Sequence, residues 1–254
     1  MKKSFIKYLT LSLYLILVFY CQFNPRLINC LLIDFSDMEK IAPNIYVSKE
    51  ISNSDKEHFL TLISKSISRV ENLWGSVKAN PVFVICSTHE DYTNFGMYKV
   101  DGLTVIYPFE TFVIISPDGI NENVISHEIC HAEMYERIGF FDDDEIPLWF
   151  HEGLASLVSH NQPKSFDGII KIWNKRSKNG RVNIDLNEIA SYDGFYGSPA
   201  ILDMPYWRSS LEVSRWYEIT GKEGLLELVT SIKSNKDFES SYAMIEEKSS
   251  REKY

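Results

Sequence analysis

Apolar side chains recur along this chain with two different spacings, which predict where helices and strands form. From residue 54 to residue 74 they return every three or four positions, as on a helix that buries one face. Shorter runs rich in β-branched residues indicate buried strands, at 45–47, 82–86, 103–107 and 111–116. We therefore expect an α+β fold, with an α/β part in residues 31–120 and a mainly helical part in residues 121–254.

Capping residues and helix breakers indicate the limits of the helices in the second part. Asn121 or Asn123 can cap a helix that stops at Gly139. Pro147 is suited to the first turn of the next helix, which continues to about residue 160. Two further helical patterns and a charged end that is expected to fray follow, at 207–220, 223–233 and 246–254.

The first thirty residues have the pattern of a secretory signal or of an N-terminal membrane anchor. Lys2, Lys3 and Lys7 form a basic head, and residues 9–23 are almost entirely apolar. The apolar run is shorter than the roughly 20 residues that a membrane span prefers. We expect residues 1–30 to be a cleaved signal or an anchor. The remaining domain, residues 31–254, is then extracytoplasmic, either secreted or held at a membrane.

Composition and charge narrow the possible partners. The 254 residues are 44% hydrophobic and carry a formal net charge of −9, which is typical of a folded globular protein without a broad basic surface. Because binding to nucleic acid depends on clustered basic side chains, this composition argues against nucleic acid as a partner.

The four cysteines do not have the spacing of a disulfide framework. Cys21 and Cys30 flank the end of the apolar N-terminal run, Cys86 lies in an expected strand, and Cys130 lies in an expected helix. A bridge between Cys86 and Cys130 is one alternative. Buried free thiols are the preferred interpretation, because cysteine is commonly a small core residue.

One pentapeptide carries the chemistry of a metal site. His127 and His131 are four residues apart, so on a helix they share one face and can offer two imidazole nitrogens to one ion. Glu128 lies beside them and can act on a water molecule held there. Glu152, in the following helix, completes a set of two histidines and one carboxylate, which leaves a fourth position of zinc open. The adjacent His151 is the alternative third ligand.

Small residues next to the third ligand favour a site shared by two helices. Gly153 and Ala155 follow Glu152 closely in the sequence. We expect these small side chains to let their helix approach the helix of the histidine pair, so that both helices hold one ion. The competing interpretation is a helix with two ordinary surface histidines. It does not explain why His127, Glu128, His131 and Glu152 occur together.

The chain resembles the gluzincin metallopeptidases of the peptidase MA-like type in two motifs, HEICH at residues 127–131 and LWFHEGLA at residues 148–155. In that family two histidines and the later glutamate bind zinc. The resemblance therefore implies that Zn²⁺ is the cofactor and that its ligands are His127, His131 and Glu152. It also implies that Glu128 is the general base.

The same resemblance implies a fold. It extends from about residue 82 to about residue 244. It predicts a zincin-like domain, in which a small mixed β-sheet packs on the helix of the HExxH motif and a mainly helical lobe follows. One edge strand of such a sheet lies along the cleft and can pair with an extended peptide. Here that strand would be 103–107 or 111–116.

Departures from related branches narrow the class. Metzincins have Gly and His three and six residues after the second histidine, where this chain has Met134 and Arg137. Thermolysin-like enzymes and large aminopeptidases have Asp four residues after the third ligand, where this chain has Ser156, so support for a zinc-bound histidine must come from elsewhere. The Gly-x-Met-Glu-Asn signature of the aminopeptidases is also absent. The resemblance thus implies an endopeptidase of unassigned specificity.

The implied activity is zinc-assisted hydrolysis of peptide bonds in a peptide or protein substrate. Zinc would lower the pKa of a water molecule, and Glu128 would take its proton and deliver it to the leaving amine. A downstream tyrosine often stabilises the oxyanion in gluzincins, and Tyr206 is our first choice, with Tyr196 second. The alternative is an extracytoplasmic zinc-binding or scaffold protein that keeps the fold without useful catalysis. The intact Glu128 argues against it.

Overall fold

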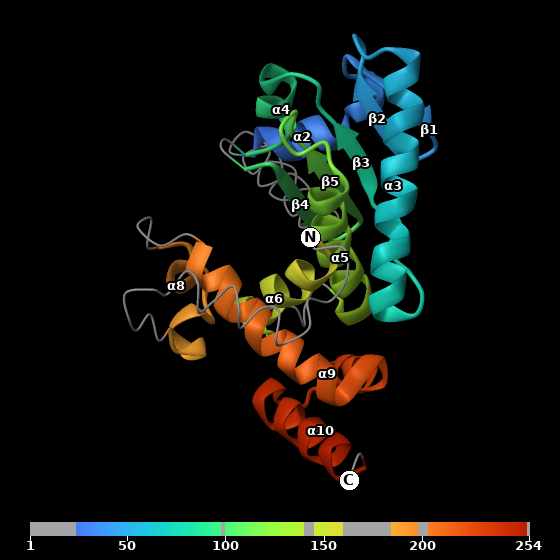
Figure 1. The fold of residues 1–254 in the computed structure, drawn as a ribbon. Helices are drawn as coiled ribbons and strands as arrows, with labels where there is room; N and C mark the ends of the chain where they lie inside the picture. The colour runs from blue at the N-terminus through green and yellow to red at the C-terminus, as the bar shows by residue number, and fades with distance from the viewer. Residues whose placement is uncertain (1–23, 98–99, 140–144, 160–183, 198–202, 253–254) are drawn as a thin grey trace, which may run out of the picture.

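A five-stranded sheet forms the centre of the first part of the chain (Figure 1). The computed structural model describes residues 24–97, 100–139, 145–159, 184–197 and 203–252. The strands are β1 (Met38–Ala42), β2 (Ile45–Ser48), β3 (Val82–Ile85), β4 (Gly102–Tyr107) and β5 (Glu110–Ile115). Their order in space is β1-β2-β3-β5-β4, with β2, β3 and β5 parallel and β1 and β4 antiparallel at the two edges. The small mixed sheet is confirmed, and β4 is the edge strand on the side of the candidate site.

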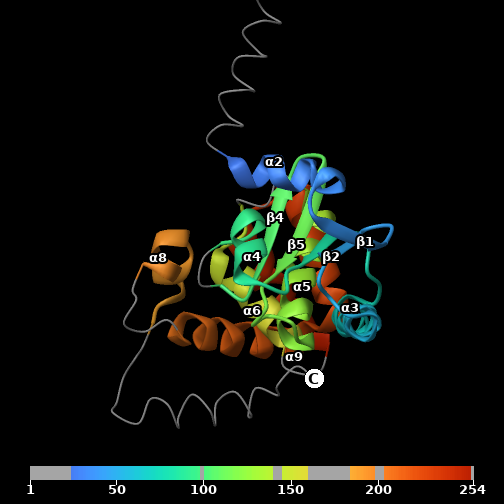
Figure 2. The same ribbon diagram turned by 90° about the horizontal axis from the view of Figure 1, so that it is seen from above.

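Helices cover both faces of this sheet (Figures 1 and 2). Alternate residues of the central strands point to opposite faces, so Val84 and Ile114 pack in one core while Phe83 and Val113 pack in the other. The first core lies under α2 (Pro25–Leu31), the 3-10 turn η1 (Ile33–Phe35) and α4 (His89–Phe95). The second lies under α3 (Asn53–Trp74) and α5 (Glu122–Ile138). Burial on both faces explains the continuous apolar runs of β3 and β5.

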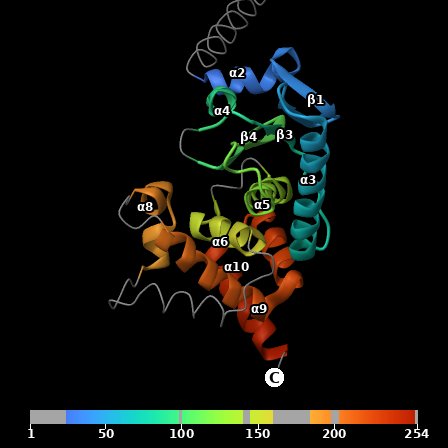
Figure 3. The ribbon, with the colours of Figure 1, turned by 45° about the horizontal axis from the view of Figure 1, so that its top comes forward.

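A helical half follows α5 in the chain. It consists of α6 (Leu148–Ser159), η3 (Leu186–Ile189), α8 (Tyr192–Tyr196), α9 (Asp203–Lys233) and α10 (Phe238–Glu252). Figure 3 shows α5 between the sheet and α6, with α9 and α10 on the far side of α6. Residues 149–159 of α6 are all buried, so this helix lies inside the molecule and not on its surface. The expected α+β class with a mainly helical second part is confirmed.

The ends of α5 are defined by local sequence. The Asn121 side chain accepts hydrogen bonds from the backbone N–H groups of Asn123 and Val124, both at 3.1 Å, so Asn121 is the cap and Asn123 is not. The helix ends before Gly139, whose φ of 105° suits a residue without a side chain. The expected limits of the histidine helix are confirmed.

A buried ion pair fixes the back of α5. Glu133 accepts a hydrogen bond from Arg137 at 2.5 Å and further bonds from the backbone N–H groups of Lys78 and Ala79, both at 2.7 Å. Arg137 also donates to the carbonyl oxygen of Ser76 at 2.7 Å. These bonds fix the loop before β3 against the side of α5 that faces away from the histidine pair, and so help to set the position of that helix.

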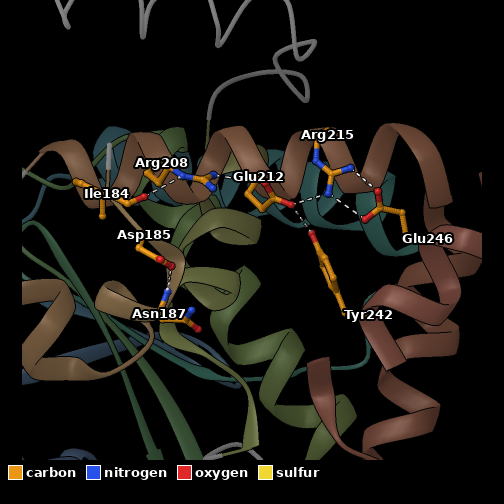
Figure 4. A network of polar contacts seen from close by, with 8 residues as sticks. All are labelled: Ile184, Asp185, Asn187, Arg208, Glu212, Arg215, Tyr242 and Glu246. Carbon is orange, nitrogen blue, oxygen red and sulfur yellow. Dashed lines mark hydrogen bonds and ion pairs between the residues drawn. The ribbon is translucent and has the colours of Figure 1, made fainter. Parts of the chain in front are cut away.

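The C-terminal helix is longer and better held than its sequence suggested. The guanidinium of Arg215 on α9 donates to both carboxylate oxygens of Glu246 on α10, at 2.5 and 2.9 Å, and to Glu212 at 2.6 Å (Figure 4). Tyr242 donates to the same Glu212 carboxylate at 3.2 Å. The expectation that 246–254 frays is therefore wrong as far as Glu252, where α10 ends. The expected break at Gly221 is present as a kink inside α9, with φ 64° and ψ −167°.

The N-terminal expectation falls mostly outside the described residues, which begin at Asn24. Helix α2 follows directly, with Leu27 and Cys30 buried, and Asn29 donates to the carbonyl oxygen of Asn94 at 2.7 Å. The expected boundary between the N-terminal segment and the domain, after residue 30, thus falls at the end of α2, which packs on the domain. Within the described ranges, no helix is both long and apolar enough to cross a membrane.

The cysteines of the described residues are free thiols. Cys30, Cys86 and Cys130 are all buried, and no bridge joins Cys86 to Cys130. Burial raises the pKa of the Cys30 and Cys130 thiols to about 12, so both are protonated at neutral pH. The preferred interpretation of buried free thiols is confirmed for Cys86 and Cys130.

Candidate metal centre

The histidine pair is arranged on one face of α5 as its spacing predicts. The Nε2 atoms of His127 and His131 lie 3.1 Å apart, with the two rings at 78° to one another. Two imidazole nitrogens at this separation point toward a common centre. Both side chains are partly exposed, to 19% and 17%, so the centre is open to a ligand from solvent.

Helix α6 brings the third candidate ligand to the same centre. The Oε2 atom of Glu152 lies 3.2 Å from Nε2 of His127 and 3.7 Å from Nε2 of His131. The three side chains form a group that can hold a metal ion, with their ligand atoms all within 4.8 Å of one another. His151 is not part of that group, and its ring centroid lies 6.5 Å from that of His131. Of the two candidates for the third ligand, the structure places Glu152 at the centre.

The state of the Glu152 carboxylate fits a metal ligand. Its Oε2 atom is buried and has no hydrogen-bond partner among the described residues. Burial acts to raise the pKa of this carboxyl, but His131 and His127 outweigh it and hold the pKa well below its usual value. A buried, ionised carboxylate is costly unless positive charge balances it, and a metal ion held between Oε2 and the two imidazole nitrogens would supply that charge. Together with two imidazole nitrogens the carboxylate makes a donor set suited to a metal ion.

Glu128 lies beside the centre and is held by the edge strand. The Thr104 hydroxyl lies 2.8 Å from Oε2 of Glu128 and 2.9 Å from its backbone carbonyl oxygen, and donates to one of them at a time. Gly102 on the same strand leaves the space that Glu128 fills, since an added Cβ there would lie 2.8 Å from Cγ of Glu128. The base expected from the motif is therefore buried to 7% exposure and firmly oriented.

Two tyrosines face the centre from the helical half. Tyr196 on α8 donates a hydrogen bond to Oε1 of Glu152 at 2.5 Å. Tyr206 on α9 lies beside His127, with ring centroids 6.5 Å apart. Burial raises the pKa of both hydroxyls, and the charge of Glu152 adds to both shifts, so both remain protonated donors.

Several of these contacts could not be read from the sequence. Tyr196 is 44 residues from Glu152 and Thr104 is 24 residues from Glu128, so neither contact follows from local spacing. The sequence does give one indication on β4. Gly102, Thr104 and Ile106 are each two residues apart, so their side of the strand faces in one direction. All three line the cavity next to α5.

The expected role of the small residue Gly153 is wrong. An added Cβ at Gly153 would lie 2.5 Å from Cγ2 of Val213 and 2.7 Å from the carbonyl oxygen of Ser209. Both of these residues belong to α9. The glycine therefore allows α6 to approach α9, on the side away from the histidine helix. Glu152 and Gly153 are adjacent on α6 and point about 100° apart, so only Glu152 faces the centre.

The centre opens into a large cavity. Its volume is about 1050 Å³, and β4 lines it with Thr104 and Ile106 while the helical half lines it with Tyr196 and Tyr206. This volume is slightly above the range of about 300–1000 Å³ that is usual for binding sites of small molecules. The candidate ligands and Glu128 also line the cavity, so a ligand in it can reach them.

Comparisons with models of protein families and with curated proteins find no match for this chain. We therefore infer its function from the chemistry of this centre.

Proposed function

We propose that this chain is a zinc-dependent endopeptidase of the gluzincin type. The observation that carries the proposal is the buried Oε2 of Glu152, which makes no hydrogen bond and lies 3.2 Å and 3.7 Å from the Nε2 atoms of His127 and His131. Glu128 lies next to this group on α5, where a metallopeptidase needs its general base. The two motifs that resemble gluzincins thus contribute to one centre.

Zinc is the metal that we propose for the site. Two imidazole nitrogens and one carboxylate oxygen are a common protein donor set of catalytic zinc, which keeps a further position for water or substrate. When bound, zinc would lower the pKa of a water molecule and polarise the carbonyl group of a substrate.

The protein side chains divide the remaining work between them. Glu128, oriented by Thr104, takes a proton from the attacking water and delivers it to the leaving amine. Tyr206 keeps a protonated hydroxyl beside His127 and donates a hydrogen bond to the oxygen that becomes negative as the peptide bond is attacked. The fixed position of both groups lowers the cost of reorganisation during the reaction.

The arrangement of β4 supports a peptide as the substrate. It is an antiparallel edge strand that lines the cavity beside α5, and no strand of the described residues pairs with its outer side. An extended peptide can add to such an edge through backbone hydrogen bonds. We propose that substrate binds along β4, in a zincin-like arrangement of the sheet and α5. An extracytoplasmic location is part of the proposal and rests on the sequence pattern of residues 1–30.

The proposal is tested with metal analysis and a peptide-library cleavage assay on wild type and on Glu128→Gln. We expect wild type to bind one zinc ion per chain and to cleave within peptides. Glu128→Gln should keep the zinc and lose turnover by about 10²-fold or more, the usual contribution of a general base. Glu136→Gln is the matched control, because Glu136 is a solvent-exposed glutamate of the same helix.

The possible results separate the candidate functions. Zinc binding without cleavage by wild type would favour the binding or scaffold protein. Full activity of Glu128→Gln would contradict the mechanism, and wild type that binds no zinc would contradict the whole proposal.

A further inference from the structure

We propose that Tyr196 is a positioning residue that orients the Glu152 carboxylate toward the metal, and that it does not act on the substrate. This inference rests on the proposed zinc site and assigns a supporting residue to the Glu152 ligand. It also separates the roles of the two tyrosines, because Tyr206 remains as the donor to the substrate.

The hydrogen bond from Tyr196 distinguishes the two oxygens of Glu152. Oε1 accepts the tyrosine hydroxyl at 2.5 Å, while Oε2 is left without a hydrogen-bond partner. It is Oε2 that lies 3.2 Å from His127 and 3.7 Å from His131. The tyrosine thus prevents the carboxylate from rotating and presents one chosen oxygen to the centre. Partners of this kind orient ligands and tune the affinity of metal sites.

The chain that carries Tyr196 is anchored to the helix that carries Glu152. The carbonyl oxygen of Ala190 accepts a hydrogen bond from the backbone N–H of Leu148, the first residue of α6, at 2.8 Å. At the start of the same segment, Arg208 of α9 donates to the carbonyl oxygen of Ile184 at 3.2 Å (Figure 4). Two anchors on two helices hold the tyrosine in place relative to the carboxylate.

The neighbouring tyrosine is placed differently. Tyr206 packs edge-on against Phe195, with ring centroids 5.0 Å apart, and its ring lies beside that of His127. The Tyr196 hydroxyl donates its single hydrogen to Glu152, so that hydrogen is not free for a substrate oxygen. The Tyr206 hydroxyl is itself in hydrogen-bond contact with the Tyr196 hydroxyl, so the two tyrosines have different places in one chain of contacts, with Tyr196 next to Glu152 and Tyr206 next to His127.

The test measures zinc affinity by competition with a chelator, for the full chain and three tyrosine variants. Tyr196→Phe should bind zinc about 10- to 100-fold more weakly, the usual effect of removing a residue that orients a ligand. Tyr206→Phe should keep the zinc affinity of wild type and lose turnover. Tyr192→Phe is the matched control and should also keep that affinity, since Tyr192 is an exposed tyrosine of the same short helix.

A spectroscopic readout separates positioning from a general loosening of the fold. Cobalt(II) in place of zinc reports its coordination through its visible absorption. In Tyr196→Phe the freed Oε1 can also approach the ion, so we expect a changed and weaker spectrum, while Tyr206→Phe keeps the spectrum of wild type. A purely structural defect would lower the melting temperature of the metal-free protein without changing the cobalt spectrum.

The outcomes distinguish this inference from the proposed function. If wild type binds zinc and Tyr196→Phe binds it equally well with the same cobalt spectrum, the positioning role is overturned and the peptidase proposal stands. If Tyr196→Phe keeps its zinc affinity but loses turnover, Tyr196 acts on the substrate, which also overturns the inference. Wild type that binds no zinc overturns both.

Discussion

The two glutamates of the candidate metal centre are each held by one hydroxyl group from a different part of the chain. Thr104 of the edge strand holds Glu128, and Tyr196 of the helical half holds Glu152. The two glutamates lie on α5 and α6, the helices between those parts. A hydroxyl at 2.8 Å or less both satisfies a buried oxygen and removes the freedom of the carboxylate to rotate.

Replacing Thr104 with valine keeps the shape of the side chain and removes the hydroxyl. We expect Thr104→Val to lower kcat about tenfold or more, because a hydrogen bond to a charged group contributes about 1.5–3 kcal/mol. Zinc content should not change, since Glu128 is not one of the proposed ligands. Steady-state kinetics on a cleaved library peptide measures the effect. Thr111→Val, on β5 at the position opposite Ile106, is the control, and equal kcat for both variants would contradict the role of Thr104.

For single residues, the sequence predicts which ones belong to a motif, but it does not predict which distant residues contact them. His127, His131 and Glu128 follow from helical spacing, and Glu152 from a second motif with a resemblance to known enzymes. Thr104 and Tyr196 act through tertiary contacts, and such contacts depend on how distant elements pack, which no local periodicity encodes.

The elements of the domain are set by local patterns, whereas their contacts are set by packing. Strand β3 and helix α5 coincide with an apolar run and a capped amphipathic pattern. The error at the C-terminus has a physical cause, since Glu246 of α10 pairs with Arg215 of α9 and Lys248 pairs with Glu227, so that these two charges bind α10 to α9. The error at Gly153 also concerns packing. A small residue lets two helices approach closely, but the sequence does not show which neighbouring helix it faces.

Replacing Gly153 with alanine tests the contact between α6 and α9. The added Cβ would lie 2.5 Å from Val213 and 2.7 Å from the carbonyl oxygen of Ser209, and backbone cannot give way cheaply. We expect Gly153→Ala to lower the free energy of unfolding by about 1–3 kcal/mol, the usual cost of overpacking.

Urea unfolding measures this difference in the free energy of unfolding. The dependence of that free energy on urea concentration should be the same in both proteins. Gly153→Ser carries one more heavy atom and should be destabilised further, which makes a graded series. A variant as stable as wild type would show that the two helices can separate at little cost.

At the scale of the whole molecule, the centre lies where the sheet half meets the helical half. His127 and His131 belong to the layer on the sheet, and Glu152 belongs to a helix buried beneath it (Figure 3). The class α+β could be predicted from periodicity. The strand order, with β5 between β3 and β4, could not, because it results from the crossover connections and from which faces the helices cover.

The network that joins α9 to α10 should make stability depend on acid. Burial acts to raise the pKa of Glu212, but Arg215 and Arg208 outweigh it and leave the pKa below the ordinary value of 4.5. A carboxyl with a lowered pKa in the folded state stabilises the fold above its unfolded pKa. That stabilisation is lost as the pH falls through the folded pKa.

We therefore expect Glu212→Gln to be less stable than wild type by about 1–3 kcal/mol at pH 7, and the difference to shrink below pH 4.5. Chemical unfolding across this pH range measures it. Glu247→Gln is the control, because Glu247 pairs with Arg251 on the exposed end of α10, where ion pairs contribute little. A difference that is constant with pH would contradict the role of the Glu212 charge.

An edge strand that is open to an extended peptide is equally open to the same strand of a second molecule. The sequence of β4 is GLTVIY, which has no charged residue and no proline, the features that usually keep exposed edges apart. Two copies that paired through β4 would also close the cavities beside it. We therefore expect self-association at high concentration to bring a loss of accessible sites, and a short peptide bound along the edge to protect the protein against it.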